Sequence, residues 1–304
     1  MSKNNEPLKQ QINESEENAG KDRMNVAYKL ASQLVKDRLE TEDKENMDIL
    51  NELQSDDIIV IEGTYDHIHL VLKNSGLPFK RIQPSELQGI KLRPDQTIFI
   101  NCAGTFPPEM TRKITVFVAD GGQLITTDWC LKSVIEVSFP GKVKYNGKST
   151  SDEVVRIEVL EKEDSILKGF LDEEADPQWW LEGSSYPIRI IDKKAVKVLV
   201  RSKQLSEKYE AEPVIISFEH GKGSVYHMIS HFYLQRSETR DAEHEMKASE
   251  YASMKGVSIA TQKMFEDAEG EIADLNYGVV QSAGTSTEFV SRALLKQKKK
   301  FRKK

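Results

Sequence analysis

Asp128 and His231 are the two side chains of this sequence best suited by type to carry out chemistry. Asp128 follows a short apolar segment, QLITT, and His231 ends another, SVYHMIS. A carboxylate and an imidazole that meet can act as a general acid/base pair or supply half of a metal site. The simpler interpretation, which we favour, is that His231 caps its strand by hydrogen bonding to a loop.

Several other polar or small residues follow apolar segments in the same way. Open α/β sheets bind ligands at the carboxyl ends of their strands, so we expect these side chains to line a pocket. The predicted pocket residues are Glu62, Thr64, Cys102, Thr105, Thr127, Trp129 and His227. His227 is included because it lies four residues before His231 and shares its face in an extended strand. Cys102 is either a nucleophile for acyl transfer or a structural residue, and we favour the structural role.

The segments that carry these residues alternate between strand and helix patterns. The expected strands are IIVI, FKRI, QTIFI and QLITT, and the expected helices are DHIHLVLKNSGL and PPEMTRKITVFVADGG. Both helices end at glycine, which favours the left-handed conformation that closes a helix. Strands that alternate with helices indicate βαβ units and a parallel sheet that is buried on both faces.

After residue 150 the pattern changes to strands without long helices between them. These strands are VVRIEVL, IRII, VKVLVRS and PVIISFEH. EHGKGSVYHMISH predicts a hairpin that turns at residues 221–223. We therefore predict an α/β, flavodoxin-like fold: a mostly parallel sheet with helices on both faces, antiparallel edge strands, and helical N- and C-terminal extensions.

These patterns divide the sequence into four segments. Residues 1–22 are polar and acidic and are predicted to be a disordered tail. Residues 23–54 form an amphipathic helical extension, residues 55–236 the α/β domain, and residues 237–304 a helical extension with a basic tail. We expect the terminal helices to bind a protein partner.

The basic tail runs from Lys296 to Lys304 and holds seven lysines or arginines in nine positions. Such a run can bind nucleic acid or another anionic surface, and that binding weakens with salt. The alternative is a solvated end without a specific ligand.

Trp179, Trp180 and Tyr186 stand close together in DPQWWLEGSSYPIRI, after an acidic loop. Aromatic side chains are enriched in exposed recognition surfaces, so we assign these three residues to a partner surface. A lid packed over the carboxyl edge of the sheet is the alternative interpretation.

Composition excludes several classes of protein. The chain has 304 residues, a net charge of −6 and two cysteines, with a polar N-terminal segment. These features argue against a disulfide scaffold or an exported protein. No apolar run approaches the ~20 residues of a membrane-spanning helix. We therefore expect a cytoplasmic protein without a membrane span, and we assign it no cofactor and no metal ligand.

Four segments together resemble the class I glutamine amidotransferase-like superfamily, in particular its ThuA-like branch. They are IIVIEGTYDHIHLVLKNSGLPFKRI, IFINCAGTFPPEMTRKITVFVADGGQLITTD, ILKGF and FEHGKGSVYHMISHFY. In that superfamily a helix ending in two glycines precedes the strand that leads to the nucleophile elbow, and a later strand ends at the catalytic histidine. The resemblance covers residues 56–236 and places Asp128 at the elbow and His231 at the histidine position.

The elbow departs from the family pattern, G-x-C-x-G, because the chain reads TTDWC at residues 126–130. Glycines allow the strained backbone of that turn, so we expect Trp129 not to fit it. Cys130 is expected to be a small buried core residue. The resemblance therefore implies a non-catalytic domain that acts as a binding or scaffolding module in a protein complex. The alternative is a hydrolase or isomerase that acts on a small polar or sugar-derived substrate through Asp128 and His231, with or without a metal ion.

Overall fold

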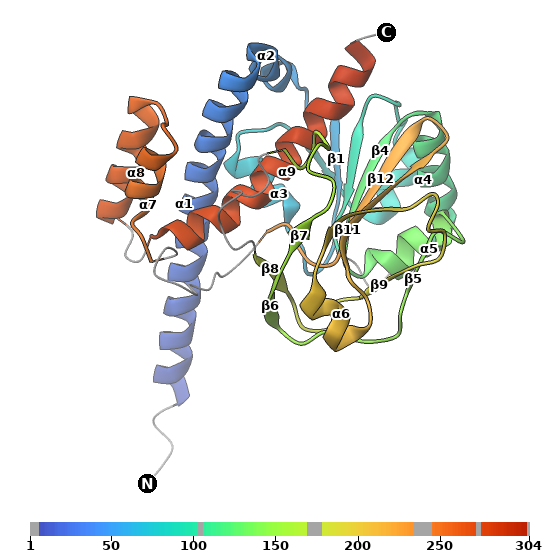
Figure 1. The fold of residues 1–304 in the computed structure, drawn as a ribbon, viewed down its shortest axis with the longest axis horizontal. Coiled ribbons are helices and arrows are strands. Elements are labelled where there is room, and N and C mark those ends of the chain that lie inside the picture. Colours follow the sequence, from blue (N-terminus) through green and yellow to red (C-terminus); the bar gives the residue numbers. More distant parts are fainter. Residues whose placement is uncertain (1–5, 103–105, 169–177, 234–244, 272–274, 303–304) are drawn as a thin grey trace. The chain divides into compact units, whose positions relative to one another are not determined.

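The chain forms two compact units, each built from two stretches of sequence (Figure 1). The computed structural model describes residues 6–102, 106–168, 178–233, 245–271 and 275–302. Unit 1 comprises residues 1–47 and 233–287, and unit 2 comprises residues 48–232 and 288–304. This division differs from the predicted one, because the last helix returns to the α/β unit instead of forming part of a separate extension.

Unit 2 is built on an eight-stranded sheet with the order β2-β1-β3-β4-β12-β11-β10-β7. Its strands are β1 (Ile58–Ile61), β2 (Lys80–Ile82), β3 (Thr97–Ile100), β4 (Gln123–Thr127), β7 (Glu158–Val159), β10 (Lys197–Arg201), β11 (Pro213–His220) and β12 (Gly223–Met228). From β2 to β12 the neighbours pair in parallel, in the 2-1-3-4-5 order of flavodoxin-like folds. Beyond β12 the strands β11, β10 and β7 pair antiparallel. The predicted fold class is confirmed.

The central strands form because their sequences are apolar on both faces. Every residue of β1, β3 and β4 is buried, as a parallel sheet covered on both sides requires. The strand register aligns Val60, Phe99, Ile125 and Tyr226 in one row across the sheet. This row is the centre of the core of unit 2.

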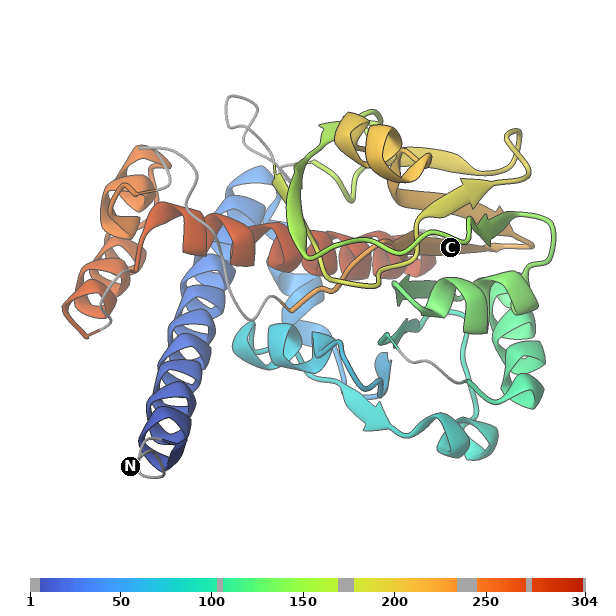
Figure 2. The same ribbon diagram turned by 90° about the horizontal axis from the view of Figure 1, so that it is seen from below.

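Helices cover both faces of this sheet. They are α3 (Ile68–Asn74), η1 (Pro84–Gly89), α4 (Pro108–Asp120), η2 (Leu131–Ile135), α5 (Glu136–Ser138), α6 (Lys203–Tyr209) and the second half of α9 (Tyr277–Arg302). The crossovers β1–α3–β2 and β3–α4–β4 run in opposite directions along the sheet, so right-handed connections place α3 and α4 on opposite faces. Figure 1 shows α4 and α5 on one side, and α3 and the second half of α9 on the other. In Figure 2 the cyan segments around β2 and the gold segments around β10 and α6 lie at opposite edges of the unit.

Two small antiparallel pairs lie outside the main sheet. β5 (Val143–Tyr145) pairs with β9 (Ile188–Ile190), and β6 (Glu153–Arg156) pairs with β8 (Gln178–Leu181). The segment VVRIEVL, predicted as one strand, is therefore divided between β6 and β7, which pair with different partners.

The predicted hairpin is confirmed as β11–β12. Gly221 has a φ of +61°, which residues other than glycine rarely adopt. A Cβ atom on Gly223 would lie 2.1 Å from the Val118 backbone oxygen. These glycines let the hairpin turn directly against the end of α4.

Unit 1 contains α1 (Glu6–Glu42), α7 (Ala248–Met254), α8 (Ile259–Glu271) and the first part of α9, and α2 (Lys44–Glu52) crosses the boundary between the units. Asp37 on α1 accepts hydrogen bonds from Ser258 N at 3.0 Å and Thr261 Oγ1 at 2.8 Å at the start of α8. Helix α1 begins at residue 6, where the sequence predicted disorder up to residue 22. The low apolar content suggested disorder, but the Glu, Lys, Gln and Ala residues in this stretch are good helix formers. No helix within the described ranges is long and apolar enough to cross a membrane.

Candidate functional site at the carboxyl ends of the parallel strands

The carboxyl ends of β1, β3, β4 and β12 meet at one edge of the sheet and place four loop segments side by side. Gly63, after β1, lies so close to the loop after β3 that an added Cβ atom would be 2.3 Å from the Cys102 backbone oxygen. The Thr64 N–H donates to the same oxygen at 3.1 Å. The loops after β1 and β3 are therefore fixed against each other, which brings their side chains to those that follow β4 and β12.

The turn after β4 has the backbone of a nucleophile elbow. Asp128 has a φ of +43°, the left-handed conformation that Asp tolerates better than most residues. Its N–H donates to Met228 O at 2.9 Å, and its carbonyl accepts from Leu131 N at 2.8 Å, where the following helix starts. The elbow thus keeps its shape without flanking glycines.

Trp129 fits this turn, contrary to the prediction from sequence. Its indole Nε1 donates to Ser184 O at 2.7 Å. Its ring stacks on Tyr186, with centroids 5.7 Å apart, and meets the edge of Tyr65 at 5.1 Å. The side chain is only partly buried and has these partners around it, so its size does not obstruct the turn.

The Asp128 carboxylate is held by the segment that precedes β9. Oδ2 accepts a hydrogen bond from Ser185 Oγ at 3.0 Å, and Oδ1 accepts one from Tyr186 N at 2.8 Å. His231 Nε2 lies 3.7 Å from Oδ2, and the side chains of His231 and Asp128 are only 2% and 4% exposed. The sequence left open whether Asp128 and His231 meet, and the structure brings them together in a buried position.

His231 is surrounded by carboxylates. Its Nδ1 lies 2.9 Å from Glu182 Oε1, an ion-pair distance without the alignment of a hydrogen bond. Burial would lower the pKa of His231, but the contact with Glu182 and the charges of Asp66 and Asp128 outweigh burial and raise that pKa to about 9. At neutral pH His231 is therefore an imidazolium, which can donate a proton but cannot accept one.

The pKa of Asp128 is shifted in the direction expected of a buried acid. Burial raises it to about 6, against the charge of His231 and the hydrogen bonds from Tyr186 and Ser185, which lower it. At pH 7 the two groups therefore form an ion pair.

Asp66 is a residue of this site that the sequence analysis missed. Its buried carboxylate accepts hydrogen bonds from His67 N at 2.7 Å, Thr127 Oγ1 at 2.9 Å and Phe232 N at 3.2 Å. It therefore ties the strand ends of β1, β4 and β12 together. An aspartate immediately before the helical pattern HIHLVLKN was an available signal, because such residues satisfy the N–H groups at the start of a helix.

Cys102 lies beside Asp128 and His231. One ligand atom each from Cys102, Asp128 and His231 lie within 4.8 Å of one another, and all three residues are buried. Burial, and then the charge of Asp128, raise the pKa of the Cys102 thiol well above its usual range. The thiol is therefore not activated as a nucleophile. Cys130 is buried as predicted, and its Sγ donates to Asn101 O at 3.1 Å.

The remaining predicted pocket residues have separate surroundings. Glu62 contacts Arg81 Nε and Gln83 Nε2, each at 2.6 Å, at the outer side of β2. Thr64 is exposed, and Thr105 lies outside the described residues. His227 accepts or donates a 2.8 Å hydrogen bond with Thr126 Oγ1. Since Thr126 and Thr127 point to opposite faces of β4, His227 lies on the face away from Asp66.

The predicted aromatic partner surface is divided by the structure. Trp179 and Trp180 are neighbours in β8, so their side chains point to opposite faces of the strand. Trp179 is buried, with Nε1 3.4 Å from Ile229 O, whereas Trp180 is half-buried. Tyr186 stacks on Tyr145 at 4.1 Å and on Trp129. The partly exposed aromatic group is therefore made of Tyr65, Trp129, Tyr145 and Tyr186, beside the elbow.

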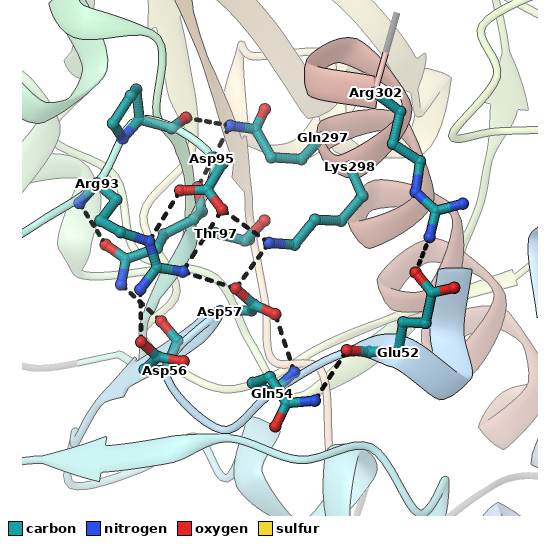
Figure 3. A network of polar contacts seen from close by, with 12 residues as sticks. Glu52, Gln54, Asp56, Asp57, Arg93, Asp95, Thr97, Gln297, Lys298 and Arg302 are labelled. Atoms are coloured by element: carbon teal, nitrogen blue, oxygen red, sulfur yellow. Dashed lines mark hydrogen bonds and ion pairs between the residues drawn. The ribbon is translucent and has the colours of Figure 1, made fainter. Parts of the chain in front are cut away.

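The basic tail is not a free arm over its described residues 296–302. Lys296 Nζ contacts Asp164 and the Tyr226 hydroxyl at 3.1 and 2.9 Å. Lys298 Nζ lies 2.7 Å from Asp57 and 3.0 Å from Asp95. Arg93 contacts the same two aspartates (Figure 3). In the same view Arg302 pairs with Glu52. These pairs neutralise much of the charge with which the tail was predicted to bind nucleic acid or an anionic surface.

The fold and this site define an α/β protein of the flavodoxin-like class in which an aspartate with a left-handed backbone follows the fourth parallel strand. No protein-family model and no curated protein sequence matches the chain.

Solved structures resemble the chain at a distance. A cytoplasmic protein from Salmonella typhimurium has 11% identity and a TM-score of 0.42, over 71% of this chain and 98% of that one. A putative ThuA-like protein from Bacteroides uniformis has 11% identity and a TM-score of 0.41, over 56% of this chain and 80% of that one. The β-galactosidase of Bacillus circulans has 11% identity and a TM-score of 0.41, over 58% of this chain. The chain spans only 27% and 29% of a GH42 β-galactosidase and the Bacillus circulans enzyme.

Proposed function

We propose that this chain is a non-catalytic amidotransferase-like domain that acts as a binding or scaffolding module in a protein complex. The observation that carries the proposal is the state of the Asp128 carboxylate. Both of its oxygens accept hydrogen bonds from the protein, and the side chain is 4% exposed. A nucleophile or general base needs access to substrate, whereas a buried carboxylate with these contacts fixes one segment of the chain to another.

The partner contact is assigned to the helices of unit 1. Three large apolar side chains are exposed on α7, on α8 and at the boundary between them: Met254 at 68%, Ile259 at 91% and Met264 at 43%. Large apolar side chains exposed to this extent are candidates for a protein interaction surface. We do not assign binding of nucleic acid to the basic tail, because Lys296, Lys298 and Arg302 have acidic partners within unit 2. A cytoplasmic location stays a prediction from the sequence.

The test compares capture of host proteins by the tagged full-length chain and by a Met254→Glu, Ile259→Glu, Met264→Glu variant. We expect the variant to capture at least tenfold less of each specific partner, measured by quantitative mass spectrometry, because charges at these positions prevent apolar contact. Deletion of residues 237–304 is unsuitable, because it would also remove the part of α9 that belongs to unit 2.

The matched control is a Val116→Glu, Val137→Glu variant, which changes exposed apolar residues on unit 2 instead. This control and Asp128→Asn should capture the same partners as the wild type. Circular dichroism should show that all variants keep their helical content. Full capture by the unit 1 variant would contradict the proposed surface.

A second candidate is a hydrolase or isomerase that acts on a small polar or sugar-derived substrate. One observation favours it: Asp128 has a left-handed backbone at a strand end and lies 3.7 Å from His231, and strained, ion-paired residues are concentrated at active sites. A panel of sugar lactones and esters would test it. Turnover that falls at least a hundredfold in Asp128→Asn but not in Glu62→Gln would support the enzyme, and turnover that is unchanged in Asp128→Asn would exclude this mechanism.

A further inference from the structure

We propose that Cys102, Asp128 and His231 form a binding site for a divalent transition-metal ion of the Zn²⁺ class. The three residues follow β3, β4 and β12, and their ligand atoms lie within 4.8 Å of one another. The ion would therefore join three strand ends that are far apart in the sequence. This site is independent of the partner surface on unit 1.

The distances are close to those of an occupied site. Ligand atoms about 2.0–2.3 Å from a tetrahedral ion lie roughly 3.5 Å from one another. The separation of Asp128 Oδ2 and His231 Nε2, 3.7 Å, already meets this requirement. The Cys102 Sγ lies within 4.8 Å of the other two ligand atoms, so it would have to approach by up to roughly 1 Å.

The orientation of His231 is the second observation that points to an ion. The ring is almost completely buried, and among the described residues neither of its nitrogens has a partner in hydrogen-bond geometry. Nε2 faces Asp128, while Nδ1 lies 2.9 Å from the Glu182 carboxylate. A histidine that binds a metal commonly directs its other ring nitrogen at a carboxylate, which fixes the ring.

The charge around the ring is compatible with a divalent cation. The carboxylates of Asp128 and Glu182 lie 3.7 and 2.9 Å from the two ring nitrogens of His231. Binding of the ion would release the thiol proton of Cys102 and one imidazole proton to solvent, so a divalent cation would bind without changing the net charge of this buried group.

The ligand types select the class of metal. Thiolate and imidazole ligands suit Zn²⁺ and related transition metals, whereas Mg²⁺ and Ca²⁺ prefer sites made of oxygen atoms. We therefore expect Zn²⁺ and Co²⁺ to bind and Mg²⁺ to compete poorly.

The test is titration of the untagged full-length chain with Zn²⁺ by equilibrium dialysis and with Co²⁺ by absorption spectroscopy. We expect one ion per chain and, for Co²⁺, a thiolate-to-metal charge-transfer band. Cys102→Ala should remove that band, and Asp128→Asn and His231→Gln should each weaken binding at least tenfold.

Two controls separate this site from other metal-binding side chains. Cys130→Ala removes the other thiol, and His67→Gln with His69→Gln removes a pair of rings whose centroids lie 5.6 Å apart. Both controls should bind one ion with the wild-type spectrum. The proposal is overturned if the wild type binds no Zn²⁺, if bound Co²⁺ shows no charge-transfer band, or if the band persists in Cys102→Ala. The wild-type spectrum decides the question even if a variant fails to fold, and none of these results depends on partner capture.

Discussion

Gln297 offers a direct test of how α9 binds unit 2. Its side chain is 2% exposed, and its Nε2 donates to Pro94 O at 2.7 Å, Gly121 O at 3.1 Å and Gln96 O at 3.4 Å. Figure 3 shows this amide beside the Arg93 and Lys298 ion pairs. If the tail were solvated, replacing Gln297 would have almost no effect on stability.

The structure sets the expected size of the effect for Gln297→Ala. Gly121 O keeps its bond from Lys300 Nζ at 3.0 Å, and Gln96 O keeps its bond from Gln123 N at 3.2 Å. Only Pro94 O would be left without a partner among the described residues, and Pro94 is exposed enough for water to reach it. An unsatisfied buried group costs about 1–3 kcal/mol, and because water can reach Pro94 we expect the lower end of that range, a loss of about 1 kcal/mol in the free energy of unfolding. Alanine is the better helix former, so helix propensity cannot account for a loss.

Gln297→Glu should destabilise unit 2 further, because a carboxylate of the same shape would face three carbonyl oxygens without a donor of its own. Even with Lys300 nearby, we expect a loss of about 2–3 kcal/mol for a buried charge in this position. The control is Gln88→Ala, at an exposed position, which should change stability by less than about 0.5 kcal/mol.

The assay is urea denaturation followed by tryptophan fluorescence. All three tryptophans, Trp129, Trp179 and Trp180, belong to unit 2, so the signal reports the unfolding of that unit. The expected order of stability is Gln88→Ala, then Gln297→Ala, then Gln297→Glu. If both Gln297 variants unfold at the same urea concentration as the control, α9 is not bound to unit 2 as described.

Three further predictions concern the backbone, unit 1 and the site. Gly223→Ala should lower the free energy of unfolding by about 3 kcal/mol or more, because its Cβ would lie 2.1 Å from a backbone oxygen of α4. The control Gly270→Ala has nothing within 4 Å of its Cβ and should be neutral or stabilise α8 by up to ~1 kcal/mol. Equal urea midpoints for the two variants would refute this packing of the hairpin on α4. Asp37→Ala should cost unit 1 about 1 kcal/mol at pH 7 in denaturation followed by circular dichroism. Burial raises the pKa of Asp37, but hydrogen bonds from the start of α8 outweigh burial and lower it, so this stabilisation should disappear as the pH falls through that pKa. The pKa of His231 in the metal-free chain is raised from 6.5 to about 9, so its stabilisation is complete below pH 6.5 and is lost as the pH rises through 9. We expect the wild type to lose ~3 kcal/mol over this range and His231→Gln to lose much less; equal pH profiles would show that the ion pair with Glu182 and Asp128 does not stabilise the fold.

The parts of the fold that were predicted correctly are those set by local sequence. The run Ile58–Ile61 is apolar at every position, which indicates a strand buried on both faces. The turn at Gly221 is marked by glycines between two alternating segments. The packing of α9 on unit 2 could not be predicted in this way, because Lys298 binds Asp57 and Asp95, both more than two hundred positions away. A lysine run shows its charge in the sequence but not its partners.

The same distinction applies to the site. The placement of Asp128 and His231 at one edge of the sheet could be anticipated, because both follow strands whose carboxyl ends lie at that edge. Whether their side chains meet could not, because the 3.7 Å contact depends on the packing of the loops around them. Glu182 and Ser185 could not be anticipated, because they lie in an irregular segment whose path depends on tertiary packing. Trp129 was predicted wrongly because the rule that glycines flank an elbow depends on what surrounds the turn. Here the aspartate adopts the left-handed conformation, and the indole lies against Tyr186.

The division of unit 2 into residues 48–232 and 288–304 has a consequence for synthesis on the ribosome. The sheet is translated long before the helix that covers the row containing Tyr226, because more than fifty residues of unit 1 are made in between. During that interval the exposed apolar face has no covering helix, and partly folded chains of this kind are prone to aggregate. A nascent chain stalled before residue 288 should therefore bind chaperones, and release of residues 288–302 should end that binding.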